Sequence, residues 1–217
     1  MNIFKTIHED IQAVKEHDPA APHSFVIWLS YSGLHARWSH VIEHWLWRHG
    51  RTNISRVLAQ ITRFFTGVEI HPAAKIGRRF FIDHAMGVII GETSVIGDDV
   101  TLYQGVTLGG TGNETGKRHP TLEDHVLVGV GASVLGNITI GAHSKIGGGA
   151  VVVNDVPPNC TVVGIPGHIV VRDGARVEEE QSDAALHKEC LPDPTAEAIE
   201  ALQKRIEELE KKQGSNS

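Results

Sequence analysis

The most regular feature of the chain is a repeat of aliphatic residues at every sixth position between residues 70 and 152. With two breaks in the count, the repeat comprises Ile70, Ile76, Ile82, Ile90, Ile96, Leu102, Leu108, Leu122, Val128, Val134, Ile140, Ile146 and Val152. A period of six fits neither an amphipathic helix nor an isolated strand, but it fits short strands that are joined by tight turns and stacked on one another. Three such units would make one triangular turn, so we expect about four to five coils of a parallel β-helix.

The residues that follow each aliphatic agree with this prediction. Glycine comes directly after the aliphatic at seven of the thirteen sites. The fourth position after it is mostly small or β-branched, as at Ala74, Ser94, Val100 and Ala132. Small residues suit corners at which a Cβ would crowd the backbone. Each unit would therefore place one aliphatic side chain inside a narrow prism and turn a corner at the small residues.

Residues 1–66 carry a different pattern, in which apolar residues lie three and four positions apart. This spacing predicts helices. A first helix would end before Asp18, because Pro19 disfavours helical backbone in the residue before it. A second would cover about residues 24–48, and a third would cover about residues 53–66. The resulting helical domain would cover one open end of the β-helix, which a repeat protein needs for solubility.

The repeat ends beyond Val152 in two segments rich in proline and glycine, and residues 171–195 are polar. Apolar residues then step by three, four and three positions, which predicts a short helix at about residues 195–212. At about two heptads this helix is too short to be stable alone, so it would either bundle across subunits, which we favour, or pack on the β-helix. The sequence thus predicts an α+β solenoid with an N-terminal helical domain (1–66), a β-helix domain (67–170) and a C-terminal tail (171–217).

Composition narrows the classes of function. The net charge is −6, from 20 basic and 26 acidic residues, and no basic tract is present, so nothing favours nucleic-acid binding. No apolar run is long enough to span a membrane, and residues 1–20 lack the layout of a signal peptide. Two cysteines, Cys160 and Cys190, imply no disulfide framework. We therefore expect a cytoplasmic protein with reduced thiols.

The second break in the repeat is the larger one. The step from Leu108 to Leu122 is fourteen residues, so eight extra residues loop out of one corner. Excursions from a rigid scaffold are where binding groups tend to lie. An Arg118-His119 pair held at the foot of this loop by Pro120 suits recognition of a carboxylate. A solvated basic turn is the alternative interpretation.

A second candidate pair is Glu69 and His84. In a prism with about eighteen residues per coil, residues fifteen apart lie on adjacent coils and close to one face. A carboxylate beside an imidazole fixes the histidine tautomer and stabilises its protonated form, which makes a competent general base. Two polar neighbours on the surface of a solenoid would also be compatible with a purely structural role.

Taken together, the motifs of residues 10–167 resemble those of the serine O-acetyltransferases. The matching segments are Asp18-Pro-Ala, Glu69-Ile-His-Pro-Ala-Ala-Lys-Ile-Gly, Asp83-His-Ala-Met-Gly, Gly105-Val-Thr-Leu-Gly-Gly-Thr-Gly, Lys117-Arg-His-Pro and Gly164-Ile-Pro-Gly. The resemblance implies transfer of acetyl from acetyl-CoA to L-serine in cysteine biosynthesis, with no metal and no permanently bound cofactor. It also implies a left-handed parallel β-helix, and the handedness rests on it alone, because chain chirality generally favours right-handed crossovers.

The resemblance assigns roles to individual residues. His84 would be the general base on the serine hydroxyl, and Glu69, at a position where relatives have Asp, would orient it. His119 would complete the serine pocket or polarise the acetyl carbonyl. Asp18 and Asp83 would bind the substrate ammonium, and Arg118 would bind its carboxylate. Together with His119, these are the predicted substrate-binding residues.

The resemblance also implies partners. Acetyl-CoA would lie in a groove between coils of neighbouring subunits, and the chain would form a homotrimer, with a hexamer left open. The matching positions are Gly110, Thr111, Val130, Gly131, Lys145 and Gly148, although the glycines would equally suit plain β-helix turns. The chain ends in Gly214-Ser-Asn-Ser, whereas relatives that bind O-acetylserine sulfhydrylase end in Ile, so that complex is not expected. L-Cysteine, which shares the ammonium and carboxylate of serine, is expected to inhibit in the same pocket.

Three alternatives remain open at this point. A related enzyme could acetylate a sugar or antibiotic hydroxyl, but it would not need Asp18 and Arg118 to bracket an amino acid. A zinc enzyme of the carbonic-anhydrase type would hold its metal with three histidines, but His71, His84 and His119 lack the closely spaced pair that such enzymes use. A catalytically silent β-helix that serves as an interaction scaffold is the third.

Overall fold

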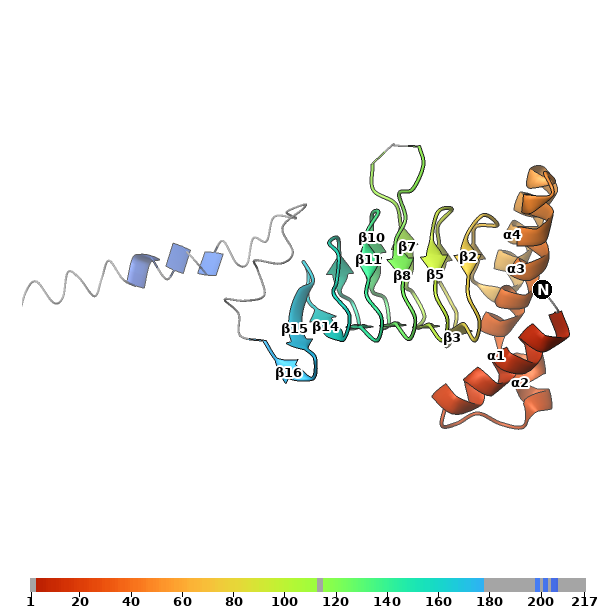
Figure 1. Cartoon of the computed structure of the whole chain (residues 1–217), viewed down its shortest axis with the longest axis horizontal. Helices are drawn as coiled ribbons and strands as arrows, with labels where there is room; N and C mark the ends of the chain where they lie inside the picture. Colours follow the sequence, from red (N-terminus) through yellow and green to blue (C-terminus); the bar gives the residue numbers. More distant parts are fainter. Residues whose placement is uncertain (1–2, 113–114, 178–197, 200, 203, 207–217) are drawn as a thin grey trace, which may run out of the picture.

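The computed structural model describes residues 3–112, 115–177, 198–199, 201–202 and 204–206. Helices gather at one end of the described chain, and a stack of short strands extends from them (Figure 1). The helices are α1 (Ile3–His17), α2 (Ser24–Ser30), α3 (Ser32–Arg48) and α4 (Thr52–Thr66). Within the predicted C-terminal helix at about 195–212, the described residues are helical. Its other residues and most of the predicted tail, 178–197, lie outside the described residues.

The strands are two to five residues long and follow one another at short intervals. They are β1 (Glu69–Ile70), β2 (Lys75–Ile76), β3 (Phe81–Ile82), β4 (Ile89–Ile90), β5 (Val95–Ile96), β6 (Thr101–Leu102), β7 (Thr107–Gly109), β8 (Thr121–Leu122), β9 (Leu127–Val128), β10 (Ser133–Leu135), β11 (Thr139–Ile140), β12 (Lys145–Ile146), β13 (Val151–Val152), β14 (Cys160–Val163), β15 (His168–Arg172) and β16 (Ala175–Arg176). Each aliphatic of the six-residue repeat lies in a strand of its own, from β1 to β13.

Successive strands pass in turn to three sheets. We call these the A sheet, ordered β1-β4-β7-β10-β13, the B sheet, ordered β11-β8-β5-β2, and the C sheet, ordered β16-β15-β14-β12-β9-β6-β3. Pairing is parallel from β1 to β14, and β15 and β16 add antiparallel strands at the far end. Because every third strand returns to the same sheet, three strands and three corners make one coil. The predicted combination of helices and parallel sheets is confirmed.

The interior of the stack is filled by the aliphatic repeat. Ile70, Ile90, Leu108, Val134 and Val152 face one another in register along the A sheet, and all are buried. Of the thirteen repeat positions, twelve are buried, and Ile76 is partly buried against the same core. Burying a side chain of this size contributes about 1.5–3 kcal/mol, so each coil stabilises the next mainly through its interior aliphatics.

The predicted second helix is wrong in one respect, because it is two helices. Tyr31 separates α2 from α3 with an extended backbone (φ −89°, ψ 98°). Just beyond it, Gly33 packs on the first coil so closely that a Cβ would lie 2.2 Å from the carbonyl oxygen of Ile82. The break lets α3 pass close to β3. This contact joins segments that are far apart in the sequence, so the local apolar pattern could not predict it.

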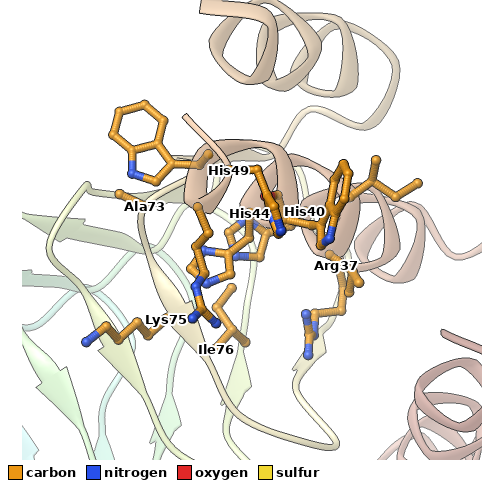
Figure 2. Close-up of a pocket in the computed structure, with 12 residues that line it drawn as sticks. Arg37, His40, His44, His49, Ala73, Lys75 and Ile76 are labelled. Carbon is orange, nitrogen blue, oxygen red and sulfur yellow. The ribbon is translucent and has the colours of Figure 1, made fainter. Parts of the chain in front are cut away.

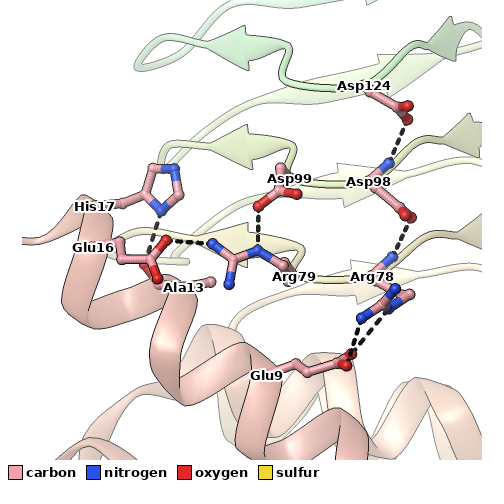
Figure 3. Close-up of polar contacts among 9 residues, drawn as sticks. All are labelled: Glu9, Ala13, Glu16, His17, Arg78, Arg79, Asp98, Asp99 and Asp124. Carbon is pink, nitrogen blue, oxygen red and sulfur yellow. Dashed lines mark hydrogen bonds and ion pairs between the residues drawn. The ribbon is translucent and has the colours of Figure 1, made fainter.

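Helix α1 is fixed to the corner between the B and C sheets by charged side chains (Figure 3). Arg78 bonds to Glu9 at 2.6 Å, and Arg79 bridges Glu16 and Asp99. Partly exposed pairs of this kind contribute about 0–1 kcal/mol each, so they set the position of α1 more than they stabilise it. These ion pairs hold the C-terminal end of α1 beside the first coil.

Helix α4 leaves a row of large apolar side chains on the surface. Ile54, Val57, Ile61, Phe64 and Phe65 are all exposed, with Phe64 at 83% and Phe65 at 78%. Its other side packs on α3 and β1. In the described part of the chain, no helix combines the length and the apolar character that crossing a membrane requires.

Candidate active site

His84 lies in the turn that joins β3 to β4, at the corner between the C and A sheets. Its backbone φ is 56° and that of Ala85 is 58°, a left-handed conformation that costs about 1–2 kcal/mol for a non-glycine residue. The turn is held by backbone bonds, from Asp83 N–H to Leu102 at 2.9 Å and from Gly87 N–H to Gly67 at 2.9 Å. The His84 side chain is 73% exposed. A fixed backbone thus presents a freely accessible imidazole.

The acid nearest His84 is its neighbour. Oδ2 of Asp83 lies 3.9 Å from Nε2 of His84, close enough for an ion pair but not for a hydrogen bond. Glu69 lies on β1 in the A sheet, and its carboxylate pairs with Arg63 of α4 at 2.9 Å. In the described chain no hydrogen bond or ion pair joins Glu69 to His84. The predicted contact between them is therefore not made within one chain, and the role of Glu69 stays a prediction.

Arg118 and His119 lie at the next corner, between the A and B sheets, against the turn that follows β4. The hydroxyl of Thr93 accepts the backbone N–H groups of both residues at 3.0 Å and lies 2.9 Å from Nδ1 of His119. The backbone N–H of Thr93 points to the same nitrogen at 3.2 Å. Because Nδ1 accepts this N–H, the ring proton of neutral His119 lies on Nε2.

Burial lowers the pKa of His119, and the charge of Arg118 lowers it further. The imidazole is therefore neutral near pH 7, with a donor at Nε2. Gly91 makes room for the ring, since a Cβ at this position would lie 1.9 Å from Cδ2 of His119. Arg118 pairs with Glu92 at 2.7 Å, with both side chains about one-third exposed. This corner thus offers a guanidinium and a neutral N–H donor side by side.

Two residues of this corner were not identified from the sequence. Thr93 and Glu92 belong to the polar turn after β4, and both organise the Arg118-His119 pair. Their role was hard to predict from the sequence, because polar residues are common in any turn that follows a strand. His71 is also near, and burial, together with Arg56, lowers its pKa to about 4. In the described residues no cluster of three or more His, Cys, Asp or Glu side chains is arranged to hold a metal.

Asp18 follows the last residue of α1. Its Oδ2 accepts the phenol O–H of Tyr31 at 2.5 Å, and its Oδ1 accepts the N–H of Ala20 at 2.8 Å. Asp83, at the end of β3, is close enough to Tyr31 to raise the pKa of the phenol. The structure therefore brings the two predicted ammonium-binding acids to one region, beside the His84 turn.

The residues predicted for acetyl-CoA lie in three places. Val130, Gly131 and Gly148 lie at the C–A corner, in turns that stack above the His84 turn through backbone bonds such as Gly131 N–H to Gln104 at 2.9 Å. Gly110 and Thr111 lie at the other corner, beside Arg118, and a Cβ on Gly110 would lie 3.1 Å from the Arg118 side chain. Lys145 is exposed on β12.

A cavity of about 1130 Å³ lies elsewhere, between α3 and the first coil (Figure 2). Its lining includes Arg37, His40, His44 and Lys75. None of the residues predicted to bind serine or acetyl-CoA lines it. The candidate site is instead made of groups at two corners that flank the A sheet, with His84 exposed and His119 buried.

Comparison with known proteins settles the family. No family model matches the chain. The serine acetyltransferase of Bacillus licheniformis is 54% identical over 206 residues, which cover 95% of this chain and 93% of that protein, and the Staphylococcus xylosus enzyme is 54% identical over 94% of this chain and 92% of that protein. The chain belongs to the serine acetyltransferase family. The predicted family and the predicted enzyme class, acyltransferase, are thus confirmed.

Solved serine acetyltransferases have the same architecture. The Neisseria gonorrhoeae enzyme in complex with serine aligns with a TM-score of 0.74 and 45% identity, over 76% of this chain and 68% of that one. A serine acetyltransferase in complex with cysteine aligns with a TM-score of 0.77 and 46% identity, over 78% and 70% of the two chains.

Proposed function

We propose that this serine acetyltransferase transfers the acetyl group of acetyl-CoA to the hydroxyl of L-serine, giving O-acetyl-L-serine and CoA in cysteine biosynthesis. The observation that carries the proposal is the pair of corners on either side of the A sheet. One presents an exposed imidazole beside two acids, and the other presents a guanidinium beside a neutral imidazole donor. An amino-acid alcohol needs these groups: acids for its ammonium, a cation for its carboxylate and a base for its hydroxyl.

The chemistry follows from the groups at hand. His84 removes the hydroxyl proton of serine as its oxygen attacks the thioester carbon, and the carbonyl electrons move to oxygen. The Nε2–H of His119 stabilises that oxyanion. When the tetrahedral intermediate collapses, the C–S bond breaks and the CoA thiolate takes the proton from the His84 imidazolium. A general base supplies about 10²–10⁴-fold of the acceleration, so positioning by Arg118, Asp18 and Asp83 must supply much of the rest.

The two corners belong to one site only if two subunits meet. His84 precedes β4 and the His119 corner follows it, so the two groups lie on opposite edges of the A sheet within one chain. We infer that the His84 corner of one subunit faces the Arg118-His119 corner of its neighbour in a homotrimer. The exposed apolar side chains of α4 supply a further surface for association, and a hexamer remains open.

Two further statements belong to this proposal. The three-sheet stack, 67–170, would be a left-handed parallel β-helix, flanked by the helical domain 1–66 and the tail 171–217. Acetyl-CoA would lie along the C–A corner, where Val130, Gly131 and Gly148 expose backbone groups, with Lys145 near its phosphates. Gly131 adopts a φ of 65° and a Cβ on it would meet nothing within 4 Å, so this corner is open to a ligand.

Thiol release from acetyl-CoA tests the function directly. L-Serine should give stoichiometric CoA and O-acetylserine, whereas a galactoside or an aminoglycoside should give none. Addition of L-cysteine should suppress formation of O-acetylserine in competition with serine, measured by chromatography because cysteine itself carries a thiol. Release with a sugar and not with serine would reassign the acceptor, and no release with any acceptor would support the scaffold alternative.

A further inference from the structure

The phenol of Tyr31 makes a short bond to one of the predicted substrate-binding acids. Its O–H donates to Oδ2 of Asp18 at 2.5 Å, across thirteen residues of sequence. The other oxygen of Asp18 accepts the N–H of Ala20 at 2.8 Å. Both carboxylate oxygens are thus held, and the orientation of the carboxylate plane is set.

Tyr31 is itself rigidly placed. It is the extended residue between α2 and α3, and its carbonyl accepts the N–H groups of Leu34 at 3.1 Å and His35 at 3.2 Å. Its ring packs against the apolar cluster of Val14, Ile27, Leu34 and Phe81. This cluster joins α1, α2, α3 and β3, so the phenol is a fixed reference point between the helices and the first coil.

The position of Asp18 is electrostatically unfavourable without such a partner. It directly follows the C-terminal end of α1, where the helix macrodipole repels a negative charge by about 0.3–1 kcal/mol. Asp83 is also near the phenol, since the charges of both acids act on Tyr31. Two like charges repel each other, and a hydrogen bond donated to one of them offsets part of that repulsion.

Tyr31 remains a donor throughout the physiological range. Burial, the bond to Asp18 and the charges of Asp18 and Asp83 raise its pKa to about 12. The phenol therefore stays protonated near neutral pH and keeps its O–H for the bond to Asp18.

We propose that Tyr31 is a positioning residue for the substrate ammonium: its hydrogen bond fixes the orientation of the Asp18 carboxylate, near Asp83. The inference rests on the proposed function and deepens it, because it explains how two like charges are kept side by side before a cation binds. Tyr31 touches no reacting atom. It acts through Asp18, and its effect should be confined to ligands that carry an α-ammonium group.

The test is Tyr31→Phe, compared with Trp38→Phe. The first removes only the hydroxyl that bonds to Asp18. The second removes a comparable bond, from the Trp38 indole to Asp10 at 3.0 Å, beside the same apolar cluster but away from Asp18. A hydrogen bond to a charged group contributes roughly 1.5–3 kcal/mol, equivalent to about 10- to 100-fold.

Tyr31→Phe should raise the KM for L-serine at least about tenfold and leave the KM for acetyl-CoA and kcat within about threefold. The inhibition constant of L-cysteine should rise in parallel. Trp38→Phe should lower the melting temperature without any of these changes.

The Asp18→Asn variant distinguishes a specific effect of Tyr31→Phe on Asp18 from a folding defect. In that background Tyr31→Phe should add little, because the carboxylate that it positions is gone. Equal effects of the two aromatic variants, or an unchanged serine KM in Tyr31→Phe, would overturn the inference. Failure of the proposed function is distinguishable, because the unmodified chain would then release no thiol with serine.

Discussion

Gly91→Ala offers a sharp test of the Arg118-His119 corner. In the structure the His119 ring occupies the space beside Gly91 that any larger residue would fill. A Cβ there would lie 1.9 Å from Cδ2 and 2.1 Å from Nε2 of the ring, whereas ordinary contact begins near 3.4 Å. The imidazole must therefore move by about 1.5 Å, since the Gly91 backbone is fixed by its N–H bond to Leu108 at 3.0 Å.

The displacement has two separable costs. Misplacing a catalytic group by about 1 Å can cost about 10²-fold in rate, so kcat/KM for serine should fall by about that factor. The ring also loses its two bonds from Thr93, which contribute roughly 0.5–1.5 kcal/mol each. The free energy of unfolding should therefore fall by about 1–3 kcal/mol, which leaves a folded protein to assay.

A double-mutant cycle with His119→Ala identifies the cause. Once the ring is absent, Gly91→Ala should cost little further activity, because nothing remains to be displaced. Gly97→Ala is the matched control: its Cβ would clash with Asp124 at 2.4 Å, at a corner that holds none of the predicted site residues. It should reduce stability and leave the kinetic constants of the folded protein unchanged. The same loss of activity from Gly91→Ala with and without His119 would refute the assignment of His119 to the site.

Three further predictions test the other elements. His84→Ala should lower kcat by about 10²–10⁴-fold with an unchanged acetyl-CoA dissociation constant by calorimetry; retained turnover would remove His84 as the base. Arg118→Ala should raise chiefly the serine KM, whereas an unchanged KM would exclude it from the carboxylate site. Burial and the Arg37 charge lower the pKa of His40 to about 3. Below pH 6.5 the unfolded chain therefore takes up a proton that the folded chain excludes, and the free energy of unfolding falls by about 3 kcal/mol between pH 7 and pH 4. In urea unfolding from pH 7 to pH 4, His40→Gln should flatten this decline and the exposed His143→Gln should not; equal slopes in all three proteins would contradict it.

The strand stack was predictable because its pattern is set by neighbouring coils. Each interior aliphatic meets the residue one coil away in register, as Ile90 meets Ile70 and Leu108, so the requirement is repeated at every step. The same holds for the ends of α1 and α4, where Pro19 and Gly67 act through local backbone geometry. Gly67 has a φ of 73°, as expected for a helix C-cap.

Features that depend on contacts between distant segments could not be predicted in this way. Tyr31 sits between two apolar helical stretches, and the break in the helix follows from its reach to Asp18 and from the packing of its neighbour Gly33 on Ile82. Glu69 was expected to face His84 from an offset of fifteen residues. The offset counts positions along the coil, but it does not include α4, which brings Arg63 to the Glu69 carboxylate.

The irregular intervals of the six-residue repeat indicate where the site lies. The step from Ile82 to Ile90 is eight residues and that from Leu108 to Leu122 is fourteen, and the other intervals are six. The first irregular segment contains Asp83 and His84, and the second contains Arg118 and His119. Interior positions are committed to packing, and a regular corner has few residues, so an insertion adds side chains to the surface without opening the core. The two insertions flank the same sheet at opposite edges, which is the arrangement that two copies of the chain need if one is to complete the site of the other.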